Sequence, residues 1–455
     1  MIASSQGFTA RYCDVRTGQS GELVSGKHFR LDAAQISQQL VTSLSPRMID
    51  LLRVASVVYA VDRLVRRQRR GSTDWGRQLS CTVPVRDFQF WNSGDVRSLV
   101  EDSVQFVSGD SWQIKFSADL TSCDCQSIFD GFPADENPIT CLYSGGLDSA
   151  AGLAARLQQG IAAPVIPVTV RHRTDLTATT TPQLKFLAEQ LEAKLTPISV
   201  AMSMVSPQRL VDAEEASQRA RSFLFVSVGG VVAWAAGSSS LELYESGLGA
   251  INAPLLAGMQ GSQATRSTHP YFLRLMGKLL TLAAERPLSV TLPFWQMTKS
   301  EVVQSLTYGK LAELAVETIS CVSYPLRHRV RKSCGVCPAC IFRRVALVAA
   351  GIEEPSHRYQ CDLLDRRSSL NPEKLQYLKA FLLQVDHLSE VDEHRLPPLI
   401  SRHLRLTRVL EEDQTVETYL PLYRRYRHEW LSFIGKARSH DCEWTDLIDV
   451  GRQAA

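Results

Sequence analysis

The chain has 455 residues, of which 44% are hydrophobic and 21% charged, a composition typical of a globular protein with two or three domains. The formal net charge of +3 is close to balance and decides nothing about nucleic acid. We find no run of about 18 apolar residues, which excludes a membrane-spanning helix, and no apolar signal segment at the N-terminus. We therefore expect a cytoplasmic protein.

Residues 1–130 predict a folded extension of mixed α+β structure ahead of the rest of the chain. Apolar residues recur at helical spacing over residues 45–71, and this predicted helix ends in an arginine cluster. Residues 79–88 and 111–119 have the composition of short strands. The turn-forming residues at 129–138 mark the first boundary.

Aromatic residues of this extension predict a surface that docks a partner protein, because aromatics and arginines together are typical of protein interfaces. The alternative is a region that only covers a sheet or forms a homodimer. The aromatic positions are Trp75, Phe88, Phe90, Trp91 and Trp112.

Residues 136–315 predict an α/β domain in which strands alternate with helices around a parallel sheet. Strands are expected at 139–143, 163–170, 195–204 and 240–246. Helices are expected at 149–159, 181–193 and 213–237. In such a sheet, ligands bind beyond the carboxyl ends of the strands.

The sequence Ser-Gly-Gly-Leu-Asp-Ser at residues 144–149 lies where the first of these strands passes to a helix. Glycine permits a tight turn and a close approach to a ligand, and the helix start offers free N–H groups and a positive dipole end. The sequence therefore predicts a phosphate cradle. It lacks the Gly-Lys-Ser/Thr of the Walker A loop. The alternative is a turn that only joins the strand to the helix.

Residues 316–353 contain a cysteine cluster that predicts a structural zinc element. Four thiolates suit tetrahedral zinc and leave no open coordination position, and Gly335 permits the chain to fold back. An iron–sulfur cluster and a metal-free cluster are the alternatives. The expected ligands are Cys321, Cys334, Cys337 and Cys340. Basic side chains that would offset their charge are Arg327, Arg329, Arg331, Lys332, Arg343 and Arg344.

The 144–149 loop resembles the PP-loop of the ATP pyrophosphatases. Together with the pattern S-C…C-G-x-C-x-x-C-x-x-R, it is similar to the 7-cyano-7-deazaguanine synthase (QueC) family over residues 139–353. The resemblance implies a Rossmann-like sheet of the PP-loop type that uses ATP and Mg²⁺. It also implies that Asp148 braces the loop or helps to hold Mg²⁺. The implied pyrophosphate-binding residues are Ser144, Gly145, Gly146, Leu147, Asp148 and Ser149.

The activity that the resemblance implies is adenylation of the carboxylate of 7-carboxy-7-deazaguanine, followed by attack of ammonia. The chain is longer than the usual members of that family, and it resembles the QueC-like proteins of the Qat and type IV CBASS antiphage systems in residues 219–225, 245–255, 265–276 and 293–303. That resemblance implies that the activated deazapurine carboxylate is transferred to a protein amine, the N-terminus of a partner. The alternatives are a stand-alone synthase of 7-cyano-7-deazaguanine (preQ0), a PP-loop enzyme that modifies tRNA, for which Cys141 stays a candidate, and a non-enzymatic scaffold.

Further polar residues are candidates for the site, each with an ordinary structural alternative. Arg221 could clamp phosphate or carboxylate, or lie on the surface. Glu245 could accept from a purine amino group, or be a turn residue. Arg266 and His269 could bind a planar polar ligand, or cap a helix. Lys299 could stabilise phosphate charge together with the catalytic Asp148 and Ser149, or be a first-turn lysine.

Residues 354–455 predict a helical C-terminal extension, with residues 396–410 and 419–434 as the clearest helices. Arginine runs at 63–70 and 402–408 are interpreted as solvated helix faces, so nucleic acid is not an expected partner. A homodimer stays open.

Overall fold

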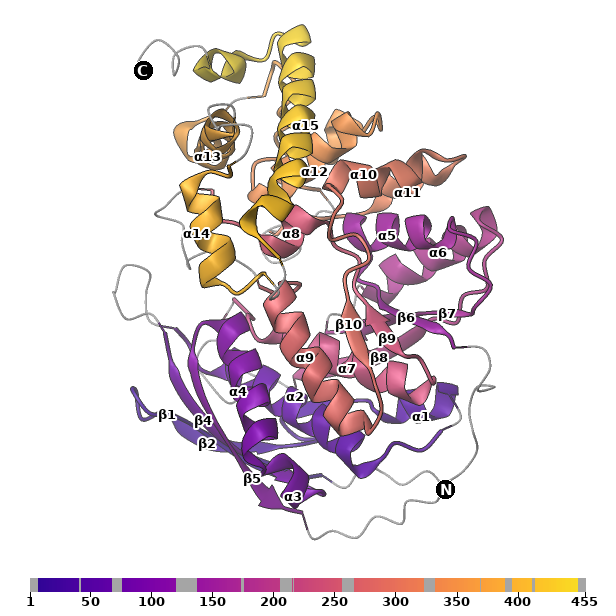
Figure 1. Ribbon diagram of the computed structural model, residues 1–455, viewed down its shortest axis with the longest axis vertical. Coiled ribbons are helices and arrows are strands. Elements are labelled where there is room, and N and C mark those ends of the chain that lie inside the picture. Colours follow the sequence, from indigo (N-terminus) through magenta and orange to yellow (C-terminus); the bar gives the residue numbers. More distant parts are fainter. Residues whose placement is uncertain are drawn as a thin grey trace.

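The computed structural model shows a parallel sheet with a second, smaller sheet at one end and helices at the other (Figure 1). The structure describes residues 7–40, 42–67, 76–119, 137–172, 176–204, 215, 217–255, 266–322, 332–368, 370–388, 395–410 and 414–448.

The main sheet has six strands in the order β10-β9-β6-β7-β8-β3. Five of them run parallel, as the alternation of strands and helices predicts. They are β6 (Ile139–Leu142), β7 (Val165–Arg171), β8 (Ile198–Met204), β9 (Ser240–Glu242) and β10 (Ser289–Thr291). The helices that accompany them are α5 (Leu147–Leu157), α6 (Leu176–Gln190), α7 (Arg221–Ala235), α8 (Gly247–Ile251), α9 (Pro270–Ala284), α10 (Lys299–Val303) and α11 (Leu311–Glu317).

The order of these strands reverses between β6 and β9. The chain runs from β6 outward to β7 and β8, and then returns to place β9 on the other side of β6. At such a switch point the two connections leave the sheet in opposite directions, which opens a crevice at the carboxyl ends of the strands. The 144–149 loop follows β6, so it lies at this switch point.

The N-terminal region forms a four-stranded sheet in the order β2-β1-β4-β5. Its two central strands pair antiparallel, whereas β4 and β5 are parallel and are joined through a helix. The strands are β1 (Thr9–Asp14), β2 (Ser20–Val24), β4 (Gln78–Val85) and β5 (Ser111–Ala118). The other elements of the region are β3 (Phe29–Leu31), α1 (Ala34–Leu40), α2 (Pro46–Leu64), α3 (Phe88–Trp91) and α4 (Gly94–Ser108).

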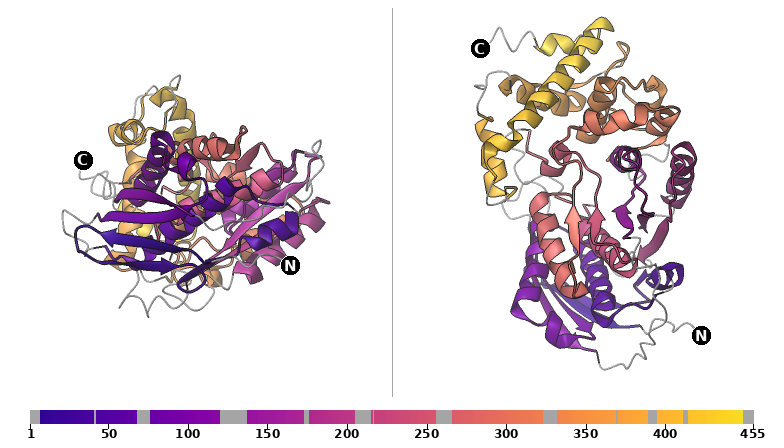
Figure 2. Two further views of the ribbon diagram at one scale, coloured as in Figure 1. Left: turned by 90° about the horizontal axis from the view of Figure 1, so that it is seen from below. Right: turned by 45° about the vertical axis from the view of Figure 1, so that its right-hand side comes forward.

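The N-terminal region shares one hydrophobic core with the main sheet. Its strand β3 pairs antiparallel with β8 at the sheet edge. Its helix α2 starts where Ser45 accepts a hydrogen bond from the amide of Met48, and it packs against β4, α7 and α9. Most residues of α2 are buried, because β4 of the smaller sheet, the edge strand β3 and helices α7 and α9 surround it. Figure 2 shows this N-terminal region at the end of the molecule opposite the C-terminal helices. The predicted boundary near residue 130 therefore does not separate two cores.

Part of the expected surface of this region lies in the interior. Arg67 is not on a solvated face, because its side chain is 8% exposed and forms an ion pair with Asp110, whereas Arg66 is exposed. Trp91 and Trp112 are 0% and 3% exposed, so these two fill the core, whereas Phe88 and Phe90 are half-buried, and the docking surface stays a prediction. Trp75 and the rest of the arginine cluster, residues 68–70, lie outside the described residues.

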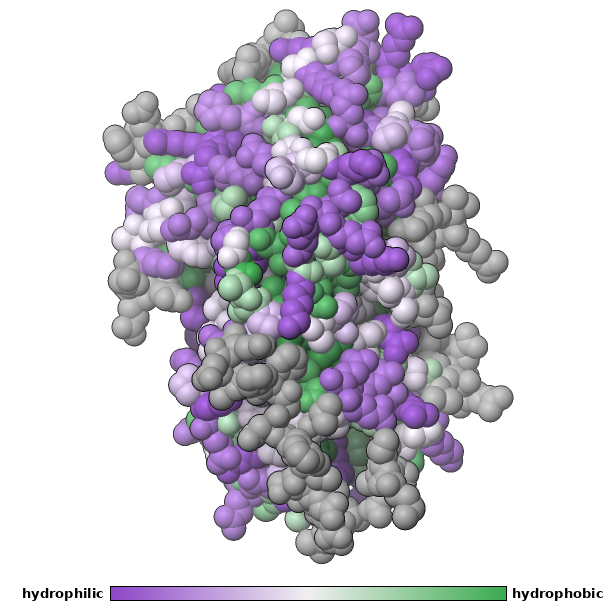
Figure 3. All heavy atoms as spheres, turned by 90° about the vertical axis from the view of Figure 1, so that its right-hand side faces the viewer, coloured by the Kyte–Doolittle hydropathy of each residue, from purple (hydrophilic) through white to green (hydrophobic). Residues whose placement is uncertain are grey.

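The C-terminal residues form helices with a core of their own. The last helix packs along α12 and contacts α8 beside the main sheet. The helices are α12 (Pro338–Ala349), α13 (Pro372–His387), α14 (Pro398–Leu406) and α15 (Leu420–Ser439). Among the described helices, none combines the length and the apolar character needed to cross a bilayer. On the face shown in Figure 3, hydrophilic residues prevail and hydrophobic ones gather toward its middle.

Candidate active site

The 144–149 loop has the backbone geometry of an anion cradle. Gly145 has φ +75°, a left-handed conformation that favours glycine. A Cβ atom there would also lie 3.1 Å from the side chains of Thr180 and Gln183. Gly146 is the N-cap of α5, so the amides of the first helical turn have no partner within the helix. These amides and the positive end of the helix dipole face the switch point.

Hydroxyl groups hold the loop in this shape. The Ser149 hydroxyl donates to the Gly146 carbonyl over 2.9 Å. It also lies 3.2 Å from the hydroxyl of Ser144. Ser144 is exposed, whereas Ser149 is 5% exposed. Ser144 can therefore reach a ligand directly, while Ser149 braces the turn.

Lys299 lies against the loop, although it follows Asp148 by 151 residues. It is the first residue of α10, which begins with a capping box formed by Thr298 and Glu301. Its ammonium group donates to both carboxylate oxygens of Asp148 and lies 5.1 Å from the ring centroid of Phe342. The lysine side chain is only 6% exposed. A buried cation next to an anion cradle is suited to binding phosphate.

Glu245 completes a cluster of three ionisable side chains at the switch point. It follows β9, and its carboxylate accepts from the Ser246 amide over 3.1 Å. Burial raises the pKa of Glu245 to about 8, the Asp148 carboxylate adds to this shift, and Lys299 opposes it. The hypothesis that Glu245 accepts a hydrogen bond from a purine amino group stays a prediction. The structure places it beside Asp148 and Lys299.

Glycines in the segment after Glu245 make room for this cluster. A Cβ on Gly249 would lie 2.2 Å from a carboxylate oxygen of Glu245. A Cβ on Gly247 would lie 1.9 Å from the carbonyl oxygen of Trp295. Both glycines therefore permit close packing of α8 against its neighbours. This packing accounts for the two glycines, so they need not form a further phosphate-binding loop.

Arg221 lies at the same edge of the sheet, one strand further along. It is the first residue of α7, and its guanidinium is 3.4 Å from Nε2 of His172 and 5.5 Å from the ring of Phe225. His172 directly follows β7, so it belongs to the same row of strand ends. Sequence analysis missed His172. Its position immediately after a predicted strand is the signal that could have found it.

Arg266 and His269 make their contacts at the start of α9. His269 is 1% exposed and accepts from the Tyr271 amide as the N-cap of this helix. Burial lowers the pKa of His269 to about 3, and the neighbouring His403 adds to this shift. Arg266 donates to the Phe106 carbonyl over 3.0 Å. Among the described residues, these contacts lie at α4 and α9 and not at the 144–149 loop, and they match the helix-cap alternative.

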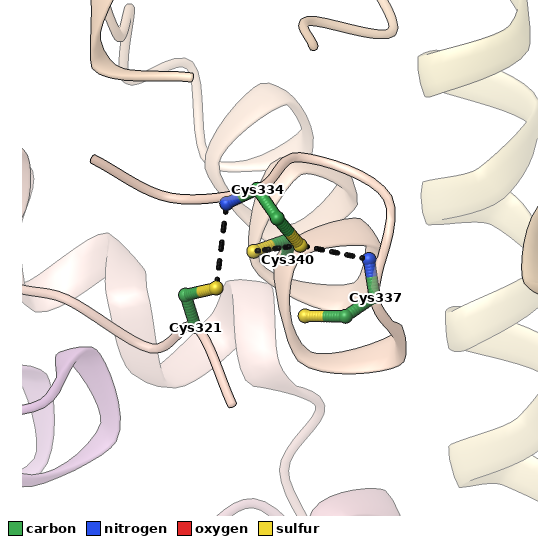
Figure 4. A group of neighbouring side chains, drawn as sticks. All are labelled: Cys321, Cys334, Cys337 and Cys340. Carbon is green, nitrogen blue, oxygen red and sulfur yellow. Dashed lines mark hydrogen bonds between the residues drawn. The ribbon is translucent and has the colours of Figure 1, made fainter. Parts of the chain in front are cut away.

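The four predicted zinc ligands converge on one point (Figure 4). The Sγ atoms of Cys321, Cys334, Cys337 and Cys340 all lie within 4.8 Å of one another. Tetrahedral zinc with bonds of about 2.3 Å places its sulfurs about 3.8 Å apart, and Cys334 and Cys340 are separated by 3.9 Å. Backbone amides donate to two of the sulfurs over 3.3 Å. The donor set and its geometry fit structural zinc.

Gly335 is the residue that permits the cysteine turn. It has φ +83°, and an added Cβ would lie 1.7 Å from the carbonyl oxygen of Cys361. Gly335→Ala is therefore expected to destabilise the protein by more than the roughly 1–3 kcal/mol of a strained backbone. Gly351→Ala is the matched control, because Gly351 has φ +74° with nothing within 4 Å. Chemical unfolding of both variants measures the difference, and equal losses would contradict this account of Gly335.

Two arginines expected to balance the thiolate charge have other partners. Arg343 is 1% exposed and forms an ion pair with Glu354 over 2.7 Å. Arg344 pairs with Asp362 over 2.9 Å. Both side chains therefore fasten α12 to the segment after it. The expected residues Arg327, Arg329 and Arg331 lie outside the described residues.

Comparison with known proteins finds similarity over part of this site. Residues 262–351 match the family described as queuosine biosynthesis protein QueC. The chain is also 36% identical over 92 residues to a 7-cyano-7-deazaguanine synthase of Anaeromyxobacter sp. (strain Fw109-5). That stretch covers 19% of this chain and 37% of the relative's length. The region that contains Lys299 and the cysteine cluster is thus QueC-like, whereas the 144–149 loop lies outside the matched residues.

Proposed function

We propose that this chain is an ATP-using enzyme of the PP-loop type that activates a carboxylate as its adenylate. The observation that carries the proposal is the convergence of the 144–149 loop, Asp148, Lys299 and Glu245 at the switch point of a parallel sheet. The QueC-like region supplies one of these residues and supports 7-deazaguanine-related chemistry.

In the proposed reaction, the loop amides and Ser144 hold the β- and γ-phosphates of ATP. A carboxylate oxygen of the substrate attacks the α-phosphorus, and the bond to the bridging oxygen breaks, so that pyrophosphate leaves. Lys299 turns from Asp148 to the phosphate oxygens and stabilises their developing charge. Asp148 and the phosphates offer the oxygen ligands that Mg²⁺ prefers, and the ion would neutralise phosphate charge.

The proposed substrate is a 7-deazaguanine that carries a carboxylate, such as 7-carboxy-7-deazaguanine. An amine then attacks the acyl carbon, a C–N bond forms, and AMP leaves with the former carboxylate oxygen. The amine is proposed to be the N-terminus of a partner protein in an antiphage system, and ammonia is the alternative acceptor. Arg221 and His172 lie at the same edge of the sheet and are candidates for contact with the substrate carboxylate.

The N-terminal region is proposed to bring that partner to the site, but truncation cannot test this idea. Removal of residues 1–130 would take β3 from the main sheet and α2 from the shared core. The test is therefore the product of the intact chain. Mass spectrometry of reactions with ATP, the deazapurine acid, ammonia and peptide amines should show a peptide adduct, and a free nitrile alone would contradict partner modification.

Cys141 is expected to be dispensable, which argues against a thiol-dependent tRNA-modifying enzyme. It is 0% exposed, and burial raises the pKa of its thiol to about 12, so almost no nucleophilic thiolate forms near neutral pH. Cys141→Ala is expected to keep AMP formation within about threefold of wild type. A loss of AMP formation with an unchanged melting temperature would favour the thiol-dependent enzyme.

A further inference from the structure

One face of the C-terminal helix α15 holds the start of α10. Glu429 on α15 accepts a short hydrogen bond from the hydroxyl of Ser300. Ser300 directly follows Lys299 and is 4% exposed, and Glu429 is 7% exposed. The contact therefore lies in the protein interior, one residue from the lysine that faces the 144–149 loop.

Two neighbouring residues of α15 also contact α10 or the residues around it. Arg425 forms an ion pair with Glu301 over 2.7 Å and donates to the Gln296 carbonyl ahead of α10. Tyr426 meets the ring of Phe342 edge to face, with centroids 5.9 Å apart. That ring in turn lies under the Lys299 ammonium. One face of α15 thus contacts the segment before α10, its first turn and the ring beneath its lysine.

Helix α10 is very short, so it depends on neighbouring elements, which include α5 and α12 and the side chains of α15. It has five residues, and isolated helices below about 12–15 residues are marginal in water. The contact with Glu429 also carries a cost. Burial raises the pKa of Glu429 to about 7, and the Ser300 hydrogen bond opposes this shift. Apolar side chains at this contact would stabilise the fold at a lower cost in desolvation free energy. The buried polar contact therefore supports a role in fixing the position of α10.

We propose that Glu429 is a positioning residue, which fixes the first turn of α10 so that Lys299 reaches the phosphate bound at the 144–149 loop. The proposal rests on the proposed function. It makes α15, which lies outside the QueC-like residues 262–351, a working part of the site. The catalytic residue is Lys299, and Glu429 acts through the backbone of α10.

The test uses the full-length chain with its metal and measures the affinity for magnesium pyrophosphate by calorimetry. Lys299→Met sets the benchmark for loss of the lysine. Glu429→Ala is expected to weaken pyrophosphate binding by about 10- to 100-fold, but by no more than Lys299→Met, because a shift of about 1 Å in a binding group is enough for an effect of this size. Glu429→Gln keeps an acceptor for Ser300 and is expected to restore most of the affinity. The exposed Glu373→Gln on α13 is the matched control and should change nothing.

The outcomes separate this inference from the proposed function. If Lys299→Met weakens pyrophosphate binding and Glu429→Ala does not, the positioning role is wrong and the phosphate site stands. If Lys299→Met leaves the affinity unchanged, the phosphate site itself is wrong, and the inference fails with it. Should Glu429→Ala fail to fold, Ser300→Ala removes the same hydrogen bond from the other side and is expected to weaken binding as well; unchanged binding would overturn the proposal.

Discussion

Asp148→Asn is expected to lower kcat for AMP formation by about 100- to 1000-fold, the usual effect of losing one preorganised charge partner at a reacting centre. The amide keeps the shape of the side chain but loses the charge that pairs with Lys299 and one of the two oxygen atoms that suit Mg²⁺. The lysine then loses its charged partner on the loop. Steady-state assays of AMP with the deazapurine acid and ATP measure the effect.

Asp95→Asn is the matched control for this variant. Asp95 is also an aspartate in the first turn of a helix, but it is exposed on α4, in the N-terminal region. Its substitution makes the same chemical change and is expected to leave kcat within about twofold of wild type, as exposed sites away from such features usually do. If Asp148→Asn also stays within that range, Asp148 has no role in the chemistry.

Loss of the metal is expected to have the largest effect on stability. Structural zinc contributes about 10–16 kcal/mol of apparent binding free energy in small zinc domains, and Cys337 is 7% exposed as the N-cap of α12. Cys337→Ser should therefore bind no metal and unfold or become sensitive to protease around α12. Metal analysis of the wild type should give about one zinc per chain.

The control for this variant is Cys13→Ser on β1, outside the cluster. It is expected to keep both metal and stability. If metal analysis of the wild type finds iron and sulfide, the cluster is an iron–sulfur centre and not a zinc site. A soluble, metal-free Cys337→Ser protein with an unchanged melting temperature would show that the cluster holds no structural metal.

Local sequence patterns were sufficient to predict the parallel strands, the position of the 144–149 loop and the cysteine turn. Each depends on residues close together in the chain, such as Gly145 and Gly146 at a strand end or Gly335 between two cysteines. Sequence analysis named Lys299 as a candidate for stabilising phosphate charge, but it did not predict the ion pair between Lys299 and Asp148. Spacing alone could not show it, since 151 residues separate the two.

The contacts that sequence patterns could not predict are long-range ones. The arginine run at the end of α2 was expected to form a solvated face, but most residues of this helix are buried against strands β3 and β4 and helices α7 and α9. Nothing local reveals that β3 joins the main sheet or that Glu429 meets Ser300 across 129 residues. Burial by distant elements also decided the roles of Trp91 and His269, whose side chains are almost completely inaccessible.

The most direct test of the central claim follows the oxygen of the substrate carboxylate. The deazapurine acid is labelled with ¹⁸O in its carboxylate and incubated with the protein, ATP and an amine. The masses of the nucleotide products are then measured by mass spectrometry. Attack of the carboxylate on the α-phosphorus predicts AMP that carries one ¹⁸O atom, together with unlabelled pyrophosphate. Formation of ADP and phosphate, or of AMP without the label, would contradict carboxylate adenylation at this site.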